Sequence, residues 1–238
     1  MRLKRYAMPW KLPVKPFHWV VSPRPGPHPK DSCLPLLIIL RDILKVAETG
    51  REAKKLIKAG KVRIDGKERR EAGYPAGLMD VIEIENLGCY RVLPGEKGLE
   101  VVEIAKKDAG WKICRIRDKR NVKGGKIQLN LHDGRNILVD SRAYKPGDSV
   151  MIQIPEQKIL KHYPLKVGQE ALIFAGKNAG KQGKIKEIRE RKSMLEKSTV
   201  ILETPEGRIE TLKDYIIVIG GKEHGKSDAR GKARKGND

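Results

Sequence analysis

The chain has 238 residues and a formal net charge of +21, because its 51 lysines and arginines outnumber its 30 aspartates and glutamates. Such a basic balance indicates a partner that is nucleic acid or another anionic surface. Residues 34–40 form the longest apolar run, which is too short to span a bilayer, and residues 1–30 lack the apolar core of a secretory signal. We therefore expect a cytoplasmic protein without a membrane partner.

Length and cysteine spacing indicate how many compact units the protein has and whether disulfides or zinc stabilise it. A chain of this length suggests two or three compact units. Cys33, Cys89 and Cys114 include no Cys-x-x-Cys pair and have no histidine at metal-ligand spacing. We interpret them as reduced structural thiols rather than a disulfide framework or a zinc knuckle, and we expect no metal and no other cofactor.

Residues 1–33 are predicted to form a basic arm. Residues 1–30 contain seven prolines, seven lysines or arginines and no acidic residue. Proline fixes φ and removes an amide donor, so we expect an extended arm with a stiff linker at residues 23–29. Its aromatic rings can stack on unpaired bases, or equally anchor the arm to the core of the protein. The predicted RNA contacts of the arm are Lys4, Arg5, Trp10, His18, Trp19 and Arg24.

Two helices and a hairpin are predicted next. Pro35 suits the first turn of a helix, and residues 36–44 are apolar almost all round, so this first helix is expected to be buried. It should pack under a second helix and under strands at residues 61–65 and 81–84. Asp65-Gly66 predicts a two-residue hairpin turn after the first of these strands.

The second helix, residues 49–59, has both of its ends specified. Thr49 and Glu52 predict a capping box, and Gly60 supplies a left-handed stop. Ala53, Leu56 and Ile57 fall on one face of the helix, whereas its cations gather on another. Such a face is often merely solvated, but residues 41–70 hold eleven lysines or arginines against five acids, which favours RNA. The predicted contacts are Arg41, Arg51, Lys54, Lys55, Lys58, Lys61 and Arg63.

From Cys89 onward the pattern becomes that of strands. Apolar residues alternate with polar ones over residues 127–131, and Asp133-Gly134 is expected to turn the chain back into residues 137–139. His132 lies beside this turn on the polar face. It is expected to be a surface histidine, because no acid and nucleophile accompany it.

The third unit begins near Lys166. Five short strands joined by glycine-bearing turns favour a small barrel. Its glycine-lysine loop at residues 176–184 is no P-loop, because the glycines are too close together and no serine or threonine follows Lys181. Glycines there would let backbone amides approach a phosphate, with a plain solvated hairpin as the alternative. The predicted RNA contacts are Lys177, Lys181 and Lys184.

Several segments together resemble one known family. Residues 34–45, 49–55, 60–67 and 74–82 are similar to the small-subunit ribosomal protein family S4e of archaea and eukaryotes. The Pro-Arg-Pro-Gly-Pro-His run that starts at Pro23 resembles its amino-terminal segment, and residues 176–185 resemble its KOW motif. The compact ends of the chain look more archaeal than eukaryotic.

The resemblance implies a multidomain α+β protein with no enzymatic activity, no catalytic residues and no small-molecule substrate. It would be a structural constituent of the small ribosomal subunit, with the small-subunit rRNA and neighbouring ribosomal proteins as partners. The implied domains are a basic arm (1–33), an S4-like RNA-binding helix–helix–hairpin domain (34–88), a β-rich central domain (89–165), a carboxyl-terminal SH3-like KOW β-barrel (166–220) and a basic flexible tail (221–238).

Two other classes share parts of this pattern. S4-type modules also resemble those fused to pseudouridine synthases, but such an RNA-modifying enzyme needs a catalytic aspartate in a large separate domain. Asp118 and Asp140 are instead expected to be turn residues. A free translation factor with a KOW module, which binds ribosomes transiently, is the other alternative.

Overall fold

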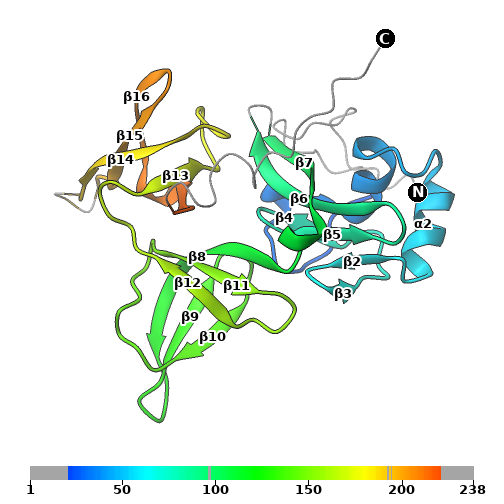
Figure 1. Cartoon of the computed structure of the whole chain (residues 1–238), viewed down its shortest axis with the longest axis horizontal. Helices are drawn as coiled ribbons and strands as arrows, with labels where there is room; N and C mark the ends of the chain where they lie inside the picture. The colour runs from blue at the N-terminus through cyan, green and yellow to red at the C-terminus, as the bar shows by residue number, and fades with distance from the viewer. Residues whose placement is uncertain (1–20, 96–97, 192, 194, 221–238) are drawn as a thin grey trace.

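The computed structural model describes residues 21–95, 98–191, 193 and 195–220 (Figure 1). These residues form three five-stranded sheets and one two-stranded ladder, all antiparallel. The described protein is mostly β, and its α-helices lie in the first unit, so the predicted combination of a small helical module with β-rich units is confirmed.

The first unit is a sheet with helices on one face. Val62 and Ile64 pair with Ile84 and Ile82 on the neighbouring strand, so alternation places their apolar side chains on one side. That side packs against the buried helical segments, as predicted. In chain order the elements are η1 (Lys30–Ser32), β1 (Cys33–Pro35), α1 (Leu36–Ile38), η2 (Ile39–Ile43), α2 (Gly50–Lys58), β2 (Val62–Ile64), β3 (Lys67–Glu68), β4 (Pro75–Gly77), β5 (Val81–Ile84), β6 (Gly88–Gly95) and β7 (Gly98–Ile104).

The apolar segment after Cys33 is buried, but it is not the single α-helix that the sequence predicts. Pro35 pairs with Pro75 in the β1–β4 ladder and precedes the short α1. The chain then widens into the π-helical turn η2, where the amide of Leu44 donates to the carbonyl of Ile39 at 2.9 Å. Every residue from 36 to 40 is buried, which is more than one face of a regular helix can bury.

Strands β6 and β7 complete the first sheet, whose order is β3–β2–β5–β6–β7. Cys89 pairs with Glu83 of β5 on one side and with Ile104 of β7 on the other. The predicted boundary between residues 88 and 89 therefore falls inside this sheet. Alternation identifies strands, but it does not say which sheet a strand joins.

The central sheet has the order β10–β9–β8–β11–β12. The predicted turn at Asp133-Gly134 does connect β9 to β10, with Gly134 at φ +76°. Asp118 was expected in a turn, but it lies within β8 at a bulge next to Ile116. The elements are η3 (Lys106–Asp108), β8 (Trp111–Asn121), β9 (Ile127–Leu131), β10 (Asn136–Val139), β11 (Ser149–Gln153) and β12 (Ile159–Tyr163).

The third sheet has the order β16–β15–β14–β13–β17 and contains the five short strands that the sequence predicts. Its pairing defines an antiparallel sheet, and closure into an SH3-like KOW barrel stays a prediction. The elements are β13 (Glu170–Ile173), β14 (Gln182–Arg189), β15 (Thr199–Thr204), β16 (Gly207–Leu212), η4 (Lys213–Tyr215) and β17 (Ile216–Val218).

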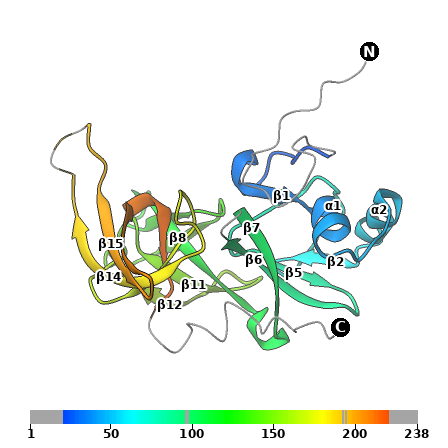
Figure 2. The ribbon, with the colours of Figure 1, turned by 90° about the horizontal axis from the view of Figure 1, so that it is seen from above.

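The three sheets are packed against one another. Figure 1 shows the third sheet above the central one, and Figure 2 shows it beside the first unit. One apolar cluster contains Leu93 of the first unit, Ile113 of the central sheet and Ile217 of the third. The hydroxyl of Ser149 also accepts a buried hydrogen bond of 2.9 Å from the amide of Val218. The predicted units are thus joined by a common core.

Among the described residues, none of the helices has the length and apolar composition needed to cross a bilayer.

Candidate nucleic-acid interface

Helix α2 presents the basic face that the sequence predicts. The amide of Glu52 donates to the Thr49 hydroxyl at 3.2 Å, and the Glu52 carboxylate accepts from the Thr49 amide at 3.4 Å, which completes the capping box. Gly60 adopts φ +75° after the last turn. Ala53 and Ile57 are fully buried, so the helix is held from one side only.

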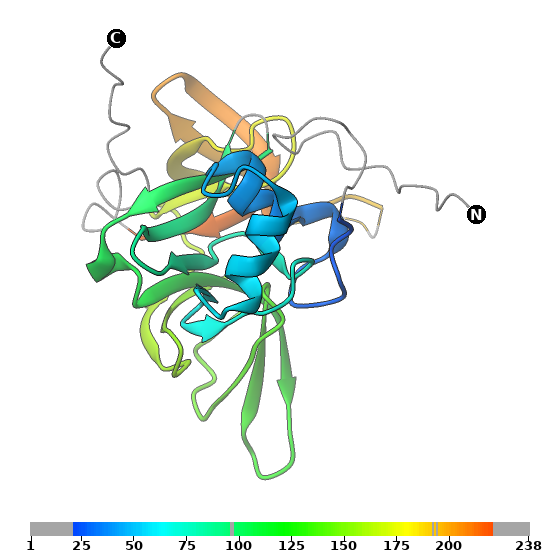
Figure 3. The ribbon, with the colours of Figure 1, turned by 90° about the vertical axis from the view of Figure 1, so that its right-hand side faces the viewer.

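The opposite side of α2 is open to solvent, and Figure 3 shows this helix on the outside of the molecule. In the part of the chain that the structure describes, no acidic side chain forms an ion pair with the lysines or the arginine on this side of α2. The face therefore has uncompensated positive charge at four exposed positions, which are Arg51, Lys54, Lys55 and Lys58.

Other predicted contacts around this module have acidic neighbours. Arg41 forms a two-pronged pair with Asp42, with both nitrogen–oxygen distances at 2.8 Å. Arg63 is exposed, and both of its cross-strand neighbours, Glu68 and Glu83, are acidic. The remaining pairs are Lys61 with Glu85 at 3.7 Å and Arg24 with Glu71 at 3.2 Å.

Exposed pairs of this kind contribute only about 0–1 kcal/mol, so a phosphate can replace the carboxylate at modest cost. The α2 face offers cations that need no such exchange. Lys4, Arg5, Trp10, His18 and Trp19, which were predicted as contacts in the arm, lie outside the described residues, as does the predicted tail.

The glycine-lysine loop between β13 and β14 has more internal structure than the sequence indicates. The amides of Gly180, Ala179 and Lys181 all donate to carbonyls of residues 173–178. A side chain on Gly176, at φ +86°, would come within 3.1 Å of the Tyr215 ring. The glycines thus allow a tight turn, and these three amides are not free for a phosphate.

The lysines of this loop differ in their surroundings. Lys181 forms a 2.6 Å pair with Glu206, and Lys184 lies in register with Glu170 and Glu203. Lys177 is exposed, with no ion-pair partner among the described residues. Figure 1 places α2 and the third sheet at opposite ends of the molecule, so the two predicted surfaces are separate.

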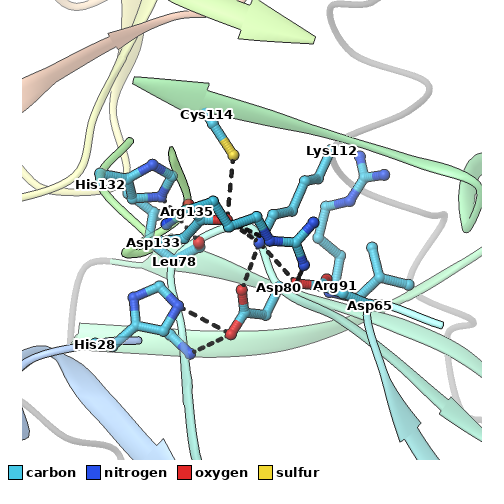
Figure 4. Close-up of polar contacts among 12 residues, drawn as sticks. His28, Asp65, Leu78, Asp80, Arg91, Lys112, Cys114, His132, Asp133 and Arg135 are labelled. Carbon is cyan, nitrogen blue, oxygen red and sulfur yellow. Dashed lines mark hydrogen bonds and ion pairs between the residues drawn. The ribbon is translucent and has the colours of Figure 1, made fainter. Parts of the chain in front are cut away.

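A buried group of charges joins the first unit to the central sheet (Figure 4). Nζ of Lys112, in β8, lies 2.7 Å from Asp65, 2.9 Å from Asp80 and 2.6 Å from Asp133. The Lys112 side chain is only 1% exposed. We call this group the ionic cluster, and its members are His28, Asp65, Asp80, Lys112, Asp133 and Arg135.

Two further cations complete the ionic cluster. Arg135 contacts Asp65 at 2.6 Å and Asp133 at 3.2 Å. Nε2 of His28 lies 2.9 Å from Asp80. With His28 protonated, three cations balance three carboxylates, which is the condition under which charges are tolerated in a protein interior.

Backbone amides hold all three carboxylates in place, and the amide of Arg135 donates to Asp133 at 3.2 Å. The amide of Gly77 donates to Asp80 at 3.0 Å, and the amide of Val81 donates to Asp65 at 3.0 Å. Both aspartates are fixed by turns, since Asp65 occupies the β2–β3 turn at φ +52° and Asp80 precedes β5. The ionic cluster is therefore rigid on the side of the first unit.

The pKa values follow from this arrangement. Burial alone would raise the pKa of Asp80, but the charges of Lys112 and His28 hold it well below its usual range. Burial likewise opposes the charge of Lys112, yet the carboxylates raise its pKa well above the ordinary value. Burial and the neighbouring Asp80 charge together raise the pKa of Asp65.

His28 brings the chain before η1 into the ionic cluster. Burial lowers the pKa of its ring, but the Asp80 carboxylate more than offsets this effect, so the pKa lies above the ordinary 6.5. The ring covers Gly77, where a Cβ atom would stand 2.3 Å from it. The predicted stiff linker at residues 23–29 is therefore docked against the first unit.

His132 is not the surface histidine that the sequence predicts. Its Nε2 lies 3.1 Å from the carbonyl of Leu78, and its Nδ1 accepts from the amide of Arg115 at 3.2 Å. Burial lowers the pKa of the ring to about 4, so the neutral form spans the central sheet and the first unit. The prediction failed because the turn that follows β9, which carries His132, packs against the first unit at Leu78.

Cys114, His132 and Asp133 offer three potential metal ligands within 4.8 Å of one another. The Asp133 carboxylate, however, already binds the Lys112 ammonium group and Arg135. Burial also raises the pKa of the Cys114 thiol well above its ordinary value, which disfavours the thiolate that a metal needs. The arrangement serves as a structural ion-pair network.

The sequence contains one signal for this network. Lys112 has the same strand parity as the buried residues Cys114 and Ile116, so a lysine stands on the core face of β8. A lysine there requires buried acidic partners. The two Asp-Gly turns supply two of them, Asp65 and Asp133.

The capped basic helix and its hairpin define a protein with an S4-type RNA-binding module, since residues 34–82 match the S4 domain model. Residues 88–159 match the model of ribosomal family S4e. The chain is 46% identical to small ribosomal subunit protein eS4 of Methanothermobacter thermautotrophicus over 226 residues, which covers 93% of each chain. It is 46% identical to the protein of that name from Methanocaldococcus jannaschii over 234 residues, covering 93% of this chain and 94% of the relative.

The fold agrees with these relatives. The crystal structure of 30S ribosomal protein S4e from Thermoplasma acidophilum superimposes with a TM-score of 0.71 at 34% identity, covering 81% of this chain and 97% of that one. The chain belongs to the ribosomal S4e family. This is a family of structural ribosomal proteins, so the RNA-modifying alternative is set aside.

Proposed function

We propose that this chain is a structural constituent of the small ribosomal subunit and that it binds the small-subunit rRNA through basic surfaces. The observation that carries the proposal is the α2 face, where four exposed cations share one side of a helix that is docked and capped on its other side. Phosphate contacts of this kind position a protein on RNA without base-specific chemistry.

Further residues and partners would complete the binding of the protein to the subunit. Lys177 and, after exchange of their carboxylate partners, Lys181 and Arg24 would add phosphate contacts on other sides of the molecule. Neighbouring ribosomal proteins would cover surfaces that the RNA leaves open, and the protein would act in the cytoplasm as part of the ribosome. Its mechanism is charge neutralisation together with a rigid shape, supplied by three sheets with a common core.

Salt dependence tests the electrostatic mechanism. If on the order of eight phosphates are neutralised, the log of the binding constant should fall against the log of salt with a slope near −6, using about −0.7 per phosphate of a single strand. The affinity of the full chain for small-subunit rRNA fragments should be measured across a potassium chloride series. A nearly flat dependence would contradict the proposal.

Charge reversal on α2 tests the location. The variant Lys54→Glu, Lys55→Glu, Lys58→Glu should weaken rRNA binding strongly while Ala53 and Ile57 keep the helix docked. A matched control reverses Lys158, Lys166 and Lys197, three exposed lysines outside the predicted contacts, and changes the net charge equally. Equal losses in both variants would show that net charge, and not the α2 face, determines binding.

Sedimentation separates a constituent from a transient factor. Retention of the protein on small subunits in a high-salt sucrose gradient is expected for a constituent. Complete release under conditions that keep other ribosomal proteins bound would favour the free translation factor.

A further inference from the structure

The hairpin between β8 and β9 extends from the central sheet away from the rest of the protein. Figures 1 and 3 both show the loop that joins these strands at the far end of the central sheet. β8 is eleven residues long, and its last part pairs with β9 as far as Asn121 with Ile127. The loop, residues 122–126, lies beyond both strands.

The hairpin is rigid almost to its end. Ile127 and Leu129 are buried in the core of the central sheet, directly opposite Asn121 and Lys119. Nζ of Lys119 donates to the carbonyls of Arg142 and Tyr144, both at 2.9 Å. The loop is therefore presented by a fixed support, which reduces the ordering cost of binding.

The end of the hairpin is strongly cationic. Between Asp118 and Asp133 the sequence contains no acidic residue but four cations. Lys119 is used internally, and Arg120 lies 3.1 Å from Asp118. Lys123 and Lys126 are exposed, and neither forms an ion pair within the described ranges.

Two consecutive glycines, Gly124 and Gly125, stand between these lysines. Both adopt positive φ, +83° and +72°, and nothing lies within 4 Å of a Cβ atom built on either. Packing within the protein therefore does not demand a glycine at either position. The loop is closed by the amide of Val122, which donates to the carbonyl of Lys126 at 2.9 Å.

An exposed stretch of backbone between two lysines has the groups needed to bind a phosphate. Lysine supplies a point charge, and amides without a neighbouring side chain can approach a phosphate oxygen closely. Within the described residues, the amides of Gly124 and Gly125 donate no hydrogen bond to a carbonyl or a carboxylate. This loop differs from the glycine loop of the third unit, where the amides of Ala179, Gly180 and Lys181 already donate to backbone carbonyls.

We propose that the β8–β9 loop is a further RNA-binding site, which takes the phosphate backbone of rRNA through Lys123, Lys126 and the amides of Gly124 and Gly125. The inference rests on the proposed function, since it assumes that the chain binds rRNA. It adds a contact from the central sheet, where the sequence predicts no RNA-binding residue.

The first test removes the two lysine charges in the full chain, as K123Q/K126Q. Two lost phosphate contacts should reduce the salt slope by about 1.4, which corresponds to an affinity loss of about 25-fold at 0.1 M salt relative to 1 M. The matched control is K158Q/K166Q, which removes the same charge from exposed positions elsewhere. Its slope and affinity should stay within about twofold of the wild-type values.

A second test needs no variant. Amine-reactive labelling of the full chain, read by mass spectrometry, should show Lys123 and Lys126 protected by small-subunit rRNA, together with Lys54 on α2. Lys158 and Lys166 should remain reactive. Protection that appears only in assembled subunits, and not on rRNA alone, would assign the loop to a protein neighbour and overturn the inference.

The outcomes separate the two proposals. A wild-type protein with flat salt dependence and no protection of either surface would overturn both. A steep wild-type dependence, with weakening by the α2 variant but with K123Q/K126Q indistinguishable from K158Q/K166Q, would overturn the loop site alone and leave the proposed function standing.

Discussion

Replacement of Lys112 by methionine should test the ionic cluster most severely. Methionine keeps much of the aliphatic length of the side chain but removes the ammonium group that lies within 2.9 Å of three carboxylates. Three buried acids would then face only Arg135 and His28. Breaking a buried ion pair by removing one partner costs about 3–5 kcal/mol, a large part of a typical stability of about 5–15 kcal/mol.

Urea unfolding, followed by circular dichroism near neutral pH, measures this loss. Lys181→Met is the matched control, because it removes a lysine from an exposed pair with Glu206 and should cost about 0–1 kcal/mol. The reasoning would be refuted if the two variants lost the same free energy of unfolding, because the buried charges would then contribute no more than a surface pair.

The pH dependence gives a second signature of the same variant. Asp80 and Asp133 have pKa values held below the ordinary 3.8, so the stability they supply is present above that value and is lost as pH falls through their folded pKa. The raised pKa of Asp65 contributes with the opposite sign. The difference in free energy of unfolding between the wild type and Lys112→Met should therefore become smaller, and not larger, below about pH 4.

Three further predictions concern single residues. A histidine titration by NMR should place the pKa of His28 above 6.5 and that of His132 near 4. The stability that His28 supplies should be lost as pH rises through its folded pKa, and a pKa of His132 above that of His28 would contradict the assigned contacts. Gly77→Ala should displace the His28 ring and cost about 1–3 kcal/mol, seen as faster proteolysis near residues 23–29, and unchanged cleavage would argue against the docked linker. Thr49→Ala should destabilise the first unit by about 1 kcal/mol through loss of the cap on α2, and a thermal midpoint equal to that of the exposed control Ser193→Ala would count against it.

Local features of this fold could be predicted because their causes lie within a few residues. The cap of Thr49 with Glu52 spans one helical turn, and the Asp65-Gly66 turn fixes the pairing of β2 with β3. Alternation along residues 127–131 likewise specifies the buried face of β9. In each case the propensity and the final structure agree.

The ionic cluster could not be predicted in the same way, because its contacts join residues far apart in sequence. His28 and Asp80 are separated by 52 positions, and Asp65 and Arg135 by 70. Lys112 signals that buried acids exist, but the sequence does not say which of the many aspartates they are. The sheet to which β6 and β7 belong could not be predicted for the same reason, since it depends on strand pairing and not on local pattern.

The ionic cluster also fixes the relative position of two proposed RNA-binding surfaces, the α2 face and the β8–β9 loop. Lys112 and Asp133 belong to the same sheet as the β8–β9 loop, whereas Asp65 and Asp80 flank the strands beneath α2. The two surfaces are thus fixed with respect to each other by buried charges and shared apolar packing. A rigid spacing of this kind lets one protein hold two RNA segments at a set separation.

A density map of the small ribosomal subunit that contains this protein tests the central claim most directly. The account predicts that the side chains of Arg51, Lys54, Lys55 and Lys58 face rRNA phosphates at contact distance, with the docked face of α2 unchanged. A map in which this face of α2 points into solvent, or in which the protein is missing from the mature subunit, would contradict the account.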